Sequence, residues 1–220
     1  MATTTTDQGF DRVAPFYDQL AHWVFGEALR QSQRVFLRDI PRGSRVLILG
    51  GGSGWILEDM ASSCQPKEIV YLEASKGMMS LTEQVVEKLS DQWDCQVELR
   101  CGNEELIGSF ETFDVIFTGF FLDLFESPRF DQIVDQLYGV LEVGGKWVFA
   151  DFQKSPARSW WQRNLVKIMY AFFRALCGIE AKELPDFEGK FEEKGLWVWK
   201  EAWFFQDMIC SQLLVKRPER

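Results

Sequence analysis

The sequence predicts an α/β fold, a three-layer sandwich in which a mostly parallel, seven-stranded sheet has helices on both faces. Three observations support this prediction. Short strand patterns alternate with helical patterns between residues 45 and 151, the strands are apolar on both faces, and two further strand patterns close the chain as an antiparallel hairpin. A chain of 220 residues with 46% hydrophobic and 26% charged residues has the size and composition of one such domain.

The elements follow from periodicity and turn signals, taken in chain order. Residues 10–38 repeat apolar side chains at three- and four-residue spacing, which is typical of a helix, and Pro41-Arg42-Gly43 ends that segment. Five strands follow, at residues 45–49, 68–73, 96–101, 113–118 and 146–151, with helices at residues 55–62, 78–89 and about 129–141. Val143-Gly144-Gly145 predicts a turn before the fifth strand. The closing hairpin pairs residues 197–204 with 208–215 across a tight turn near Gln206-Asp207.

We interpret residues 1–220 as a single domain. Residues 1–9 are expected to form a disordered tail, 10–40 an N-terminal helical cap and 156–190 a helical lid insertion. Residues 1–7 carry neither the basic nor the apolar region of a signal peptide, and no apolar run is long enough to span a membrane, so we expect a cytoplasmic protein.

Charge and metal-ligating residues exclude several classes of function. The net charge of −9 disfavours binding to nucleic-acid phosphates. Five cysteines without CxxC spacing and a single histidine, His22, argue against a disulfide framework and a zinc site, so no metal is expected.

A glycine-rich segment follows the first predicted strand. Residues Gly50 to Gly54 read Gly-Gly-Gly-Ser-Gly and precede a helix that starts at Trp55. Glycines at a strand-to-helix turn let the backbone approach a ligand closely, and open α/β sheets bind ligands at the carboxyl ends of their strands. The dinucleotide pattern G-x-G-x-x-G would need glycine where Trp55 stands, which disfavours a nicotinamide cofactor.

Glu73 ends the second predicted strand, 19 residues after Gly54. A carboxylate at this place can accept two hydrogen bonds from a ribose diol. The alternative is a solvated glutamate at a strand end, and the spacing to the glycine segment favours ribose binding.

Five motifs together resemble a known family. Residues Gly50–Gly54, Glu73, Cys101–Leu106, Phe113–Phe117 and Leu141–Trp147 fall in the order and spacing of class I S-adenosylmethionine-dependent methyltransferases, which have a Rossmann-like fold. The opening Phe10–Asp18 is similar to the branch that methylates quinones and other small molecules. The resemblance spans roughly residues 10–151.

The resemblance implies a site for S-adenosyl-L-methionine at the strand ends. The glycine segment would line its methionine and ribose parts, and Glu73 would hold the ribose hydroxyls. The segment comprises Gly50, Gly51, Gly52, Ser53 and Gly54. Further contacts are implied for Ala74, Ser75 and Met78 beside the adenine, Asn103 and Glu104 at its amino group, Thr118, Gly119 and Phe120 at the methionine end, and Tyr17 as a cover.

Two positions depart from the family pattern. Ile48 stands where the family usually has an acid that orients the methionine moiety, a role that Glu58 or Asp123 could take. Asn103 stands where the family usually has Asp, and it keeps an acceptor oxygen but loses the charge.

The chemistry requires little from the protein. A sulfonium methyl group is already electrophilic, so positioning the acceptor in line with it in a dry pocket suffices, and a base is needed only if the acceptor must lose a proton. Candidate bases are Asp123, His22 and Asp151. His22 could equally be a surface residue of the first helix, and Asp123 could cap a turn.

Residues 156–177 form a long helical pattern with aromatic and basic side chains. We leave three interpretations open, namely a lid that lines an apolar acceptor pocket, a helix that contacts anionic lipid, and a core helix with snorkelling basic residues. Membrane contact is the least favoured of the three.

These inferences predict methyl transfer from S-adenosyl-L-methionine to a small, aromatic or hydrophobic acceptor by in-line displacement. The protein is expected to be a monomer or homodimer that binds no nucleic acid. The alternatives are a non-catalytic methyltransferase-like binding domain, which Ile48 motivates, and an aminopropyl transferase, against which the single acid in Gly119–Asp123 argues.

Overall fold

A computed structural model describes residues 25–153 and 184–218. Several predictions from the sequence lie outside these ranges, namely the tail at residues 1–9, the motif at Phe10–Asp18, the roles of Tyr17 and His22, and the helix at residues 156–177, with most of the lid at 156–190.

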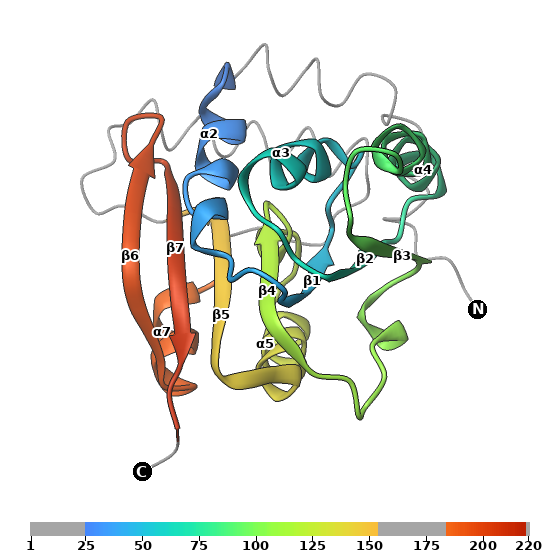
Figure 1. The fold of residues 1–220 in the computed structure, drawn as a ribbon. Helices are drawn as coiled ribbons and strands as arrows, with labels where there is room; N and C mark the ends of the chain where they lie inside the picture. The colour runs from blue at the N-terminus through green and yellow to red at the C-terminus, as the bar shows by residue number, and fades with distance from the viewer. Residues whose placement is uncertain (1–24, 154–183, 219–220) are drawn as a thin grey trace.

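A seven-stranded sheet forms the middle layer of the molecule (Figure 1), in the order β3-β2-β1-β4-β5-β7-β6. The strands are β1 (Arg45–Leu49), β2 (Glu68–Glu73), β3 (Gln96–Cys101), β4 (Phe113–Gly119), β5 (Leu141–Phe152), β6 (Leu196–Phe204) and β7 (Ile209–Lys216). The first five are parallel, whereas β7 is antiparallel to both β5 and β6. The predicted mostly parallel sheet with a C-terminal hairpin is therefore confirmed.

Helices cover both faces of this sheet. They are α2 (Ala28–Arg34), α3 (Trp55–Ser63), α4 (Lys76–Leu89), α5 (Arg129–Val140) and α7 (Phe187–Glu193), with single 3₁₀ turns η1 (Leu37–Asp39), η2 (Glu104–Leu106) and η3 (Leu122–Leu124). Side chains of α3 and α4 bury one face of the central strands, and side chains of α5 and α7 bury the other. Because both faces are covered, β1 and β2 are apolar at successive positions instead of at alternate ones.

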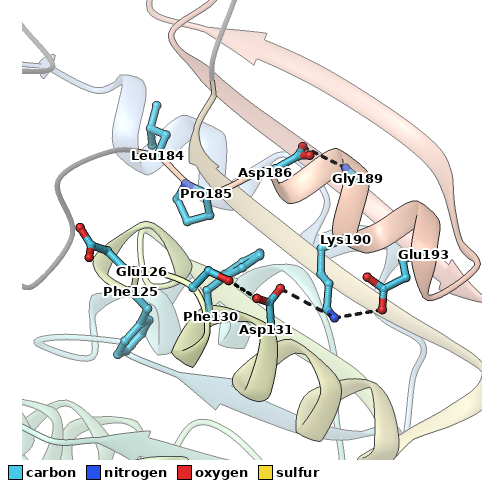
Figure 2. A pocket seen from close by; sticks show the side chains of 11 residues that line it. Phe125, Glu126, Phe130, Asp131, Leu184, Pro185, Asp186, Gly189, Lys190 and Glu193 are labelled. Carbon is cyan, nitrogen blue, oxygen red and sulfur yellow. Dashed lines mark hydrogen bonds and ion pairs between the residues drawn. The ribbon is translucent and has the colours of Figure 1, made fainter.

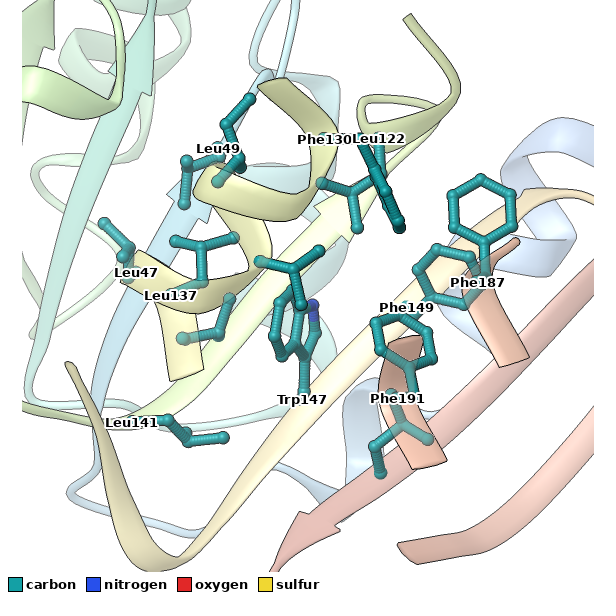
Figure 3. Close-up of a cluster of buried hydrophobic side chains, with 14 of the residues drawn as sticks. Leu47, Leu49, Leu122, Phe130, Leu137, Leu141, Trp147, Phe149, Phe187 and Phe191 are labelled. Atoms are coloured by element: carbon teal, nitrogen blue, oxygen red, sulfur yellow. The ribbon is translucent and has the colours of Figure 1, made fainter. Parts of the chain in front are cut away.

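The core on the α5 and α7 side is rich in aromatic rings (Figure 3). The Phe149 ring lies 5.0 Å from Phe187 and 5.2 Å from Phe191, and the Trp147 ring lies 5.5 Å from Phe191. Trp147 and Phe149 are fully buried. The short helix α7, for which the sequence indicated no bounds, is thus held to β5 by its two phenylalanines.

The fifth strand begins earlier than the sequence predicts. Residues 143–145 were expected to turn before a strand at Lys146, but β5 starts at Leu141, which pairs with Phe113. The register then shifts, because the next pair is Val115 with Lys146, and Gly144 takes a left-handed φ of 81° in the irregular stretch. The turn residues therefore form a bulge inside a longer strand.

No helix within residues 25–153 and 184–218 has the length and apolar character needed to cross a membrane. Four cysteines lie in these ranges, and all four are free thiols.

Candidate cofactor site at the carboxyl edge of the sheet

The glycine loop, residues 50–54, joins the carboxyl end of β1 to α3. Gly50, Gly52 and Gly54 have φ values of 62°, 68° and 82°, which lie in the left-handed region that favours glycine. A Cβ atom at Gly51 would overlap the Tyr71 hydroxyl, so this position also lacks room for a side chain. The loop therefore needs its glycines for its own conformation, and it presents bare backbone at the edge of the sheet.

Three side chains fix the peptide groups on either side of Gly52. The Tyr71 hydroxyl and the Thr82 hydroxyl donate to the Gly52 carbonyl oxygen at 3.1 and 2.9 Å. The Gly52 N–H donates to Glu73 Oε2 at 3.0 Å. Tyr71 and Thr82 are fully buried, so these contacts hold the loop from the protein interior.

Glu73 is oriented by two backbone amides, since the Ser75 N–H donates to its second oxygen, Oε1, at 2.9 Å. A carboxylate can accept about four hydrogen bonds, and the amides fix the plane of this one beside the glycine loop. This is the position from which it could receive two hydroxyl groups of a ligand. Ala74 follows it, and Ser75 caps α4 by accepting from the Met78 N–H at 3.2 Å.

Ile48, which replaces the acid of the family pattern, is completely buried within β1. Its backbone is paired between Tyr71 of β2 and Phe117 of β4. The contacts that hold the glycine loop come from Tyr71, Thr82 and Glu73, and none of them involves position 48.

The segment after β3 is held in place by polar contacts. Asn103 Oδ1 accepts from the Glu105 N–H at 3.2 Å and so caps η2. The Glu104 carboxylate accepts from Arg129 at 2.6 Å, and the Glu104 carbonyl accepts from Gln136, which ties this segment to α5. The Glu104 side chain therefore forms an ion pair with Arg129 of the same chain.

The end of β4 and the residue that follows it are held by contacts to β5. The Thr118 hydroxyl accepts from the indole N–H of Trp147 at 2.9 Å inside the core. Phe120 has a left-handed φ of 53° and donates its N–H to the Ala150 carbonyl at 2.8 Å. This conformation is uncommon for a residue with a side chain and marks a sharp turn beyond the strand.

Two neighbours of these glycines were not predicted from the sequence. The Phe121 ring contacts Gly50, and the Gln33 side chain of α2 packs against Gly119 so closely that a Cβ there would lie 2.5 Å from Gln33 Oε1. The apolar run that includes Phe121 could have indicated its role, whereas nothing in the local sequence around Gln33 does.

Two predicted candidate bases lie side by side at the ends of β4 and β5. The Asp123 N–H donates to Asp151 Oδ2 at 3.2 Å, the Phe152 N–H donates to Asp151 Oδ1 at 2.8 Å, and the two carboxyl groups share a hydrogen bond. Both side chains are buried. Burial and the nearby charge of Asp123 raise the pKa of Asp151 well above its ordinary value.

A hollow of about 690 Å³ lies between the start of α5 and α7 (Figure 2). Lys190 crosses it and pairs with Asp135 at 3.0 Å and Glu193 at 3.1 Å, so its ammonium group is neutralised within the protein. Phe125, Phe130, Leu184 and Pro185 supply its apolar lining. The glycine loop and the other strand-end residues described above are not part of its lining.

Residues 46–145 match a family model described as a methyltransferase domain. This stretch contains the glycine loop, Glu73, Asn103 and Asp123.

Two curated relatives carry the name demethylmenaquinone methyltransferase. The protein from Bacillus licheniformis is 28% identical over 143 residues, which is 63% of this chain and 59% of that protein. The protein from Bacteroides fragilis is 27% identical over 150 residues, covering 66% of this chain and 59% of that protein. The alignments thus span about three fifths of the length of these relatives.

Solved methyltransferase structures share the fold. The N-methyltransferase NodS from Bradyrhizobium japonicum, in complex with S-adenosyl-L-homocysteine, superposes with a TM-score of 0.70 at 18% identity, covering 98% of this chain and 100% of that chain. An O-methyltransferase family protein from Burkholderia thailandensis gives 0.70 at 13% identity, covering 100% of this chain and 65% of that chain. At these identities the likeness concerns the fold. The family model adds that residues 46–145, which carry the glycine loop and Glu73, are similar to a methyltransferase domain.

Proposed function

We propose that the protein transfers the methyl group of S-adenosyl-L-methionine to a small, aromatic or hydrophobic acceptor. One observation carries this proposal: the Gly52 peptide is locked between Tyr71 and Thr82 on one side and Glu73 on the other. Such an arrangement keeps bare backbone beside an oriented carboxylate, and this suits a nucleoside whose ribose hydroxyls need acceptors and whose remaining atoms need close backbone approach.

The residues of this chain would bind and orient, since the sulfonium group of the cofactor supplies a methyl group that is already reactive. Glu73 would accept from the ribose hydroxyls, and the glycine loop would lie along the methionine part. Asn103 would meet the adenine amino group, while Ala74, Ser75 and Met78 would flank the ring. The turn at Thr118, Gly119 and Phe120 would place the methionine end, and Tyr17 would cover the cofactor.

The acceptor would lie beyond the ends of β4 and β5, in line with the sulfur–methyl bond. Asp123 is the proposed proton acceptor for substrates that must lose a proton, and His22 is the alternative. The relatives are named for methylation of demethylmenaquinone, so quinol-like aromatic compounds are the first acceptors to examine.

The proposal is tested by following release of S-adenosylhomocysteine from S-adenosylmethionine in the presence of a panel of quinols, phenols and aromatic amines. We expect at least one aromatic acceptor to raise release well above the acceptor-free rate, and mass spectrometry to find the same acceptor heavier by one methyl group. A cofactor that binds but is never turned over with any compound class would contradict the enzymatic proposal and favour a binding domain.

A further inference from the structure

Beside Asp151, the end of β5 carries another buried polar residue, Gln153, whose side-chain amide donor is not paired by the fold. Gln153 follows Asp151 by two positions, and its N–H donates to the Met208 carbonyl at 3.0 Å, which continues the ladder between β5 and β7. Because side chains alternate along a strand, Gln153 and Asp151 lie on the same face of the sheet, about 6.6 Å apart along the strand. This is the face on which Asp123 contacts Asp151.

The Gln153 side chain is 5% exposed, and its Nε2 atom has no hydrogen-bond partner within residues 25–153 and 184–218. A buried amide without a partner costs free energy, so its persistence calls for an explanation. Nε2 is a donor, which means that the missing partner is an atom with a lone pair.

The Gln153 amide and the Asp123 carboxylate differ in hydrogen-bonding chemistry, and together they restrict the ligand atom that could contact both. The Gln153 amide can donate to an acceptor atom, whereas the Asp123 carboxylate can accept from a donor in addition to its contact with Asp151. A hydroxyl oxygen meets both needs and keeps one further lone pair with which to attack a methyl group. An amine nitrogen has a single lone pair, so it cannot accept from Gln153 and attack at the same time.

We infer that Gln153 and Asp123 together select an acceptor whose reacting group is a hydroxyl, with Gln153 donating to the oxygen and Asp123 accepting its hydrogen. This inference rests on the proposed function and assigns its acceptor class. It makes Gln153 a specificity-determining residue and the reaction an O-methylation.

The transfer step balances in atoms and charge. A bond forms between the acceptor oxygen and the methyl carbon as the sulfur–methyl bond breaks, and that electron pair stays on sulfur. The hydroxyl proton moves to the Asp123 carboxylate. The positive sulfonium and the negative Asp123 carboxylate therefore both become neutral.

Asp151 acts through Asp123 and is a positioning residue. It shares a hydrogen bond with the Asp123 carboxyl group, and its oxygens accept from the N–H groups of Asp123 and Phe152. These contacts would fix the Asp123 carboxylate toward the acceptor, and they hold η3 against the end of β5.

The selectivity test uses protein saturated with S-adenosylhomocysteine and matched probes, namely naphthol against naphthylamine and dihydroxynaphthalene against diaminonaphthalene. Calorimetry is expected to show that each hydroxyl compound binds about tenfold more tightly than its amine partner, because the lone pair of an aromatic amine is delocalised into the ring and leaves the buried Gln153 amide poorly paired. In Gln153→Met, a variant of similar shape, we expect the preference to fall below about threefold, with unchanged affinity for S-adenosylhomocysteine. With S-adenosylmethionine, the methylated product should be a methyl ether.

The control is Ser44→Ala. The Ser44 hydroxyl is also buried without a partner in the described chain, but it precedes β1 and so lies at the opposite edge of the sheet. This variant should keep the full hydroxyl preference. If Gln153→Met kept it too, or if the amines bound as well as the hydroxyl compounds, Gln153 would have no part in selection.

The role of Asp151 is tested by comparing Asp151→Asn, which retains a hydrogen-bond donor toward Asp123, with Asp151→Ala, which does not. Both should bind S-adenosylhomocysteine as the parent chain does. We expect Asp151→Ala to lose about tenfold or more in kcat with little change in KM, and Asp151→Asn to recover most of that loss. An equal loss in both variants would contradict positioning through the hydrogen bond.

The remaining outcomes separate this inference from the proposed function. Binding of S-adenosylhomocysteine without binding of any hydroxyl probe, or methylation on nitrogen or carbon, would reject the hydroxyl site and leave the cofactor site intact. Absence of S-adenosylhomocysteine binding would reject the proposed function, and the inference with it.

Discussion

Single residues around Gly52 decide the shape of the candidate cofactor site. Its carbonyl accepts from two buried hydroxyls and its N–H donates to Glu73, so both neighbouring peptide groups are fixed by side chains from β2 and α4. The Tyr71 ring lies under Gly51 and the Phe121 ring against Gly50, which leaves no space for a side chain at either position. Substitution of these glycines should therefore change the affinity for the cofactor more than it changes the free energy of unfolding.

Gly51→Ala is expected to weaken binding of S-adenosylhomocysteine by about tenfold or more, because the new methyl group must displace the loop from Tyr71. The matched control is Gly139→Ala in α5, where a Cβ meets no atom within 4 Å. That change should leave affinity unaltered and stabilise the helix by up to about 1 kcal/mol. Calorimetric titration of both variants checks the prediction, and equal affinities in the two would show that the loop tolerates displacement.

At the scale of elements, ion pairs join β1 and β3 to the connection before β4. Glu111, in the connection before β4, accepts from Arg100 of β3 at 2.7 Å and from Arg45 of β1 at 2.9 Å. The Gly108 N–H also donates to it at 2.7 Å. Hydrogen bonds from Arg100, from Gly108 and from Arg45 lower the pKa of Glu111 from 4.5 to about 2, against the opposing effect of burial.

This shift makes part of the stability depend on pH. Since the folded-state pKa of Glu111 lies below the unfolded value, its contribution is complete above pH 4.5 and disappears as the pH falls toward about 2. Glu111→Gln should lower the free energy of unfolding by up to about 3 kcal/mol at neutral pH, and the difference from the parent chain should narrow as the pH falls below 4.5. Urea denaturation over this range measures it, with Glu87→Gln on the exposed side of α4 as control. A difference independent of pH would contradict the assignment.

The strand periodicity predicted the first and last residues of some strands correctly, but it missed the start of β5. The bounds of β1, β2 and β3 agree with the prediction, because their apolar runs end at clear turn signals. The start of β5 was missed, since Val143-Gly144-Gly145 has the composition of a turn and only its pairing across from Phe113 makes it a bulge. Pairing between distant segments is not visible in local sequence.

At the scale of the whole molecule, one aromatic core joins the parallel strands to the C-terminal segment. Trp147 is fully buried, donates to Thr118 and packs against Phe191 of α7.

Trp147→Ala is expected to cost about 3–5 kcal/mol of folding free energy by opening a cavity. The exposed Trp199 of β6, 44% accessible, is the control, and Trp199→Ala should cost no more than about 1 kcal/mol. Thermal denaturation of the two variants checks this, and similar losses would place the core elsewhere.

The candidate site was predictable to the extent that its residues lie in motifs. The glycine loop and Glu73 follow from their spacing, and the structure places them in hydrogen-bonding contact. Thr82 and Gln153 were missed, because the first reaches Gly52 from the middle of a helix and the second is defined by a buried donor without a partner. Both depend on three-dimensional neighbours that no sequence spacing encodes.

The most direct test of the central claim is calorimetric titration of S-adenosylhomocysteine into the parent chain and into Glu73→Gln. The variant keeps the size of the side chain but replaces one carboxylate oxygen with an amide donor, opposite either the loop N–H groups or the ribose hydroxyls. We predict one site per chain with a dissociation constant in the micromolar range, about tenfold or more weaker in the variant. Absence of binding to the folded parent chain, or equal binding by the two proteins, would contradict a nucleoside site built on the glycine loop and Glu73.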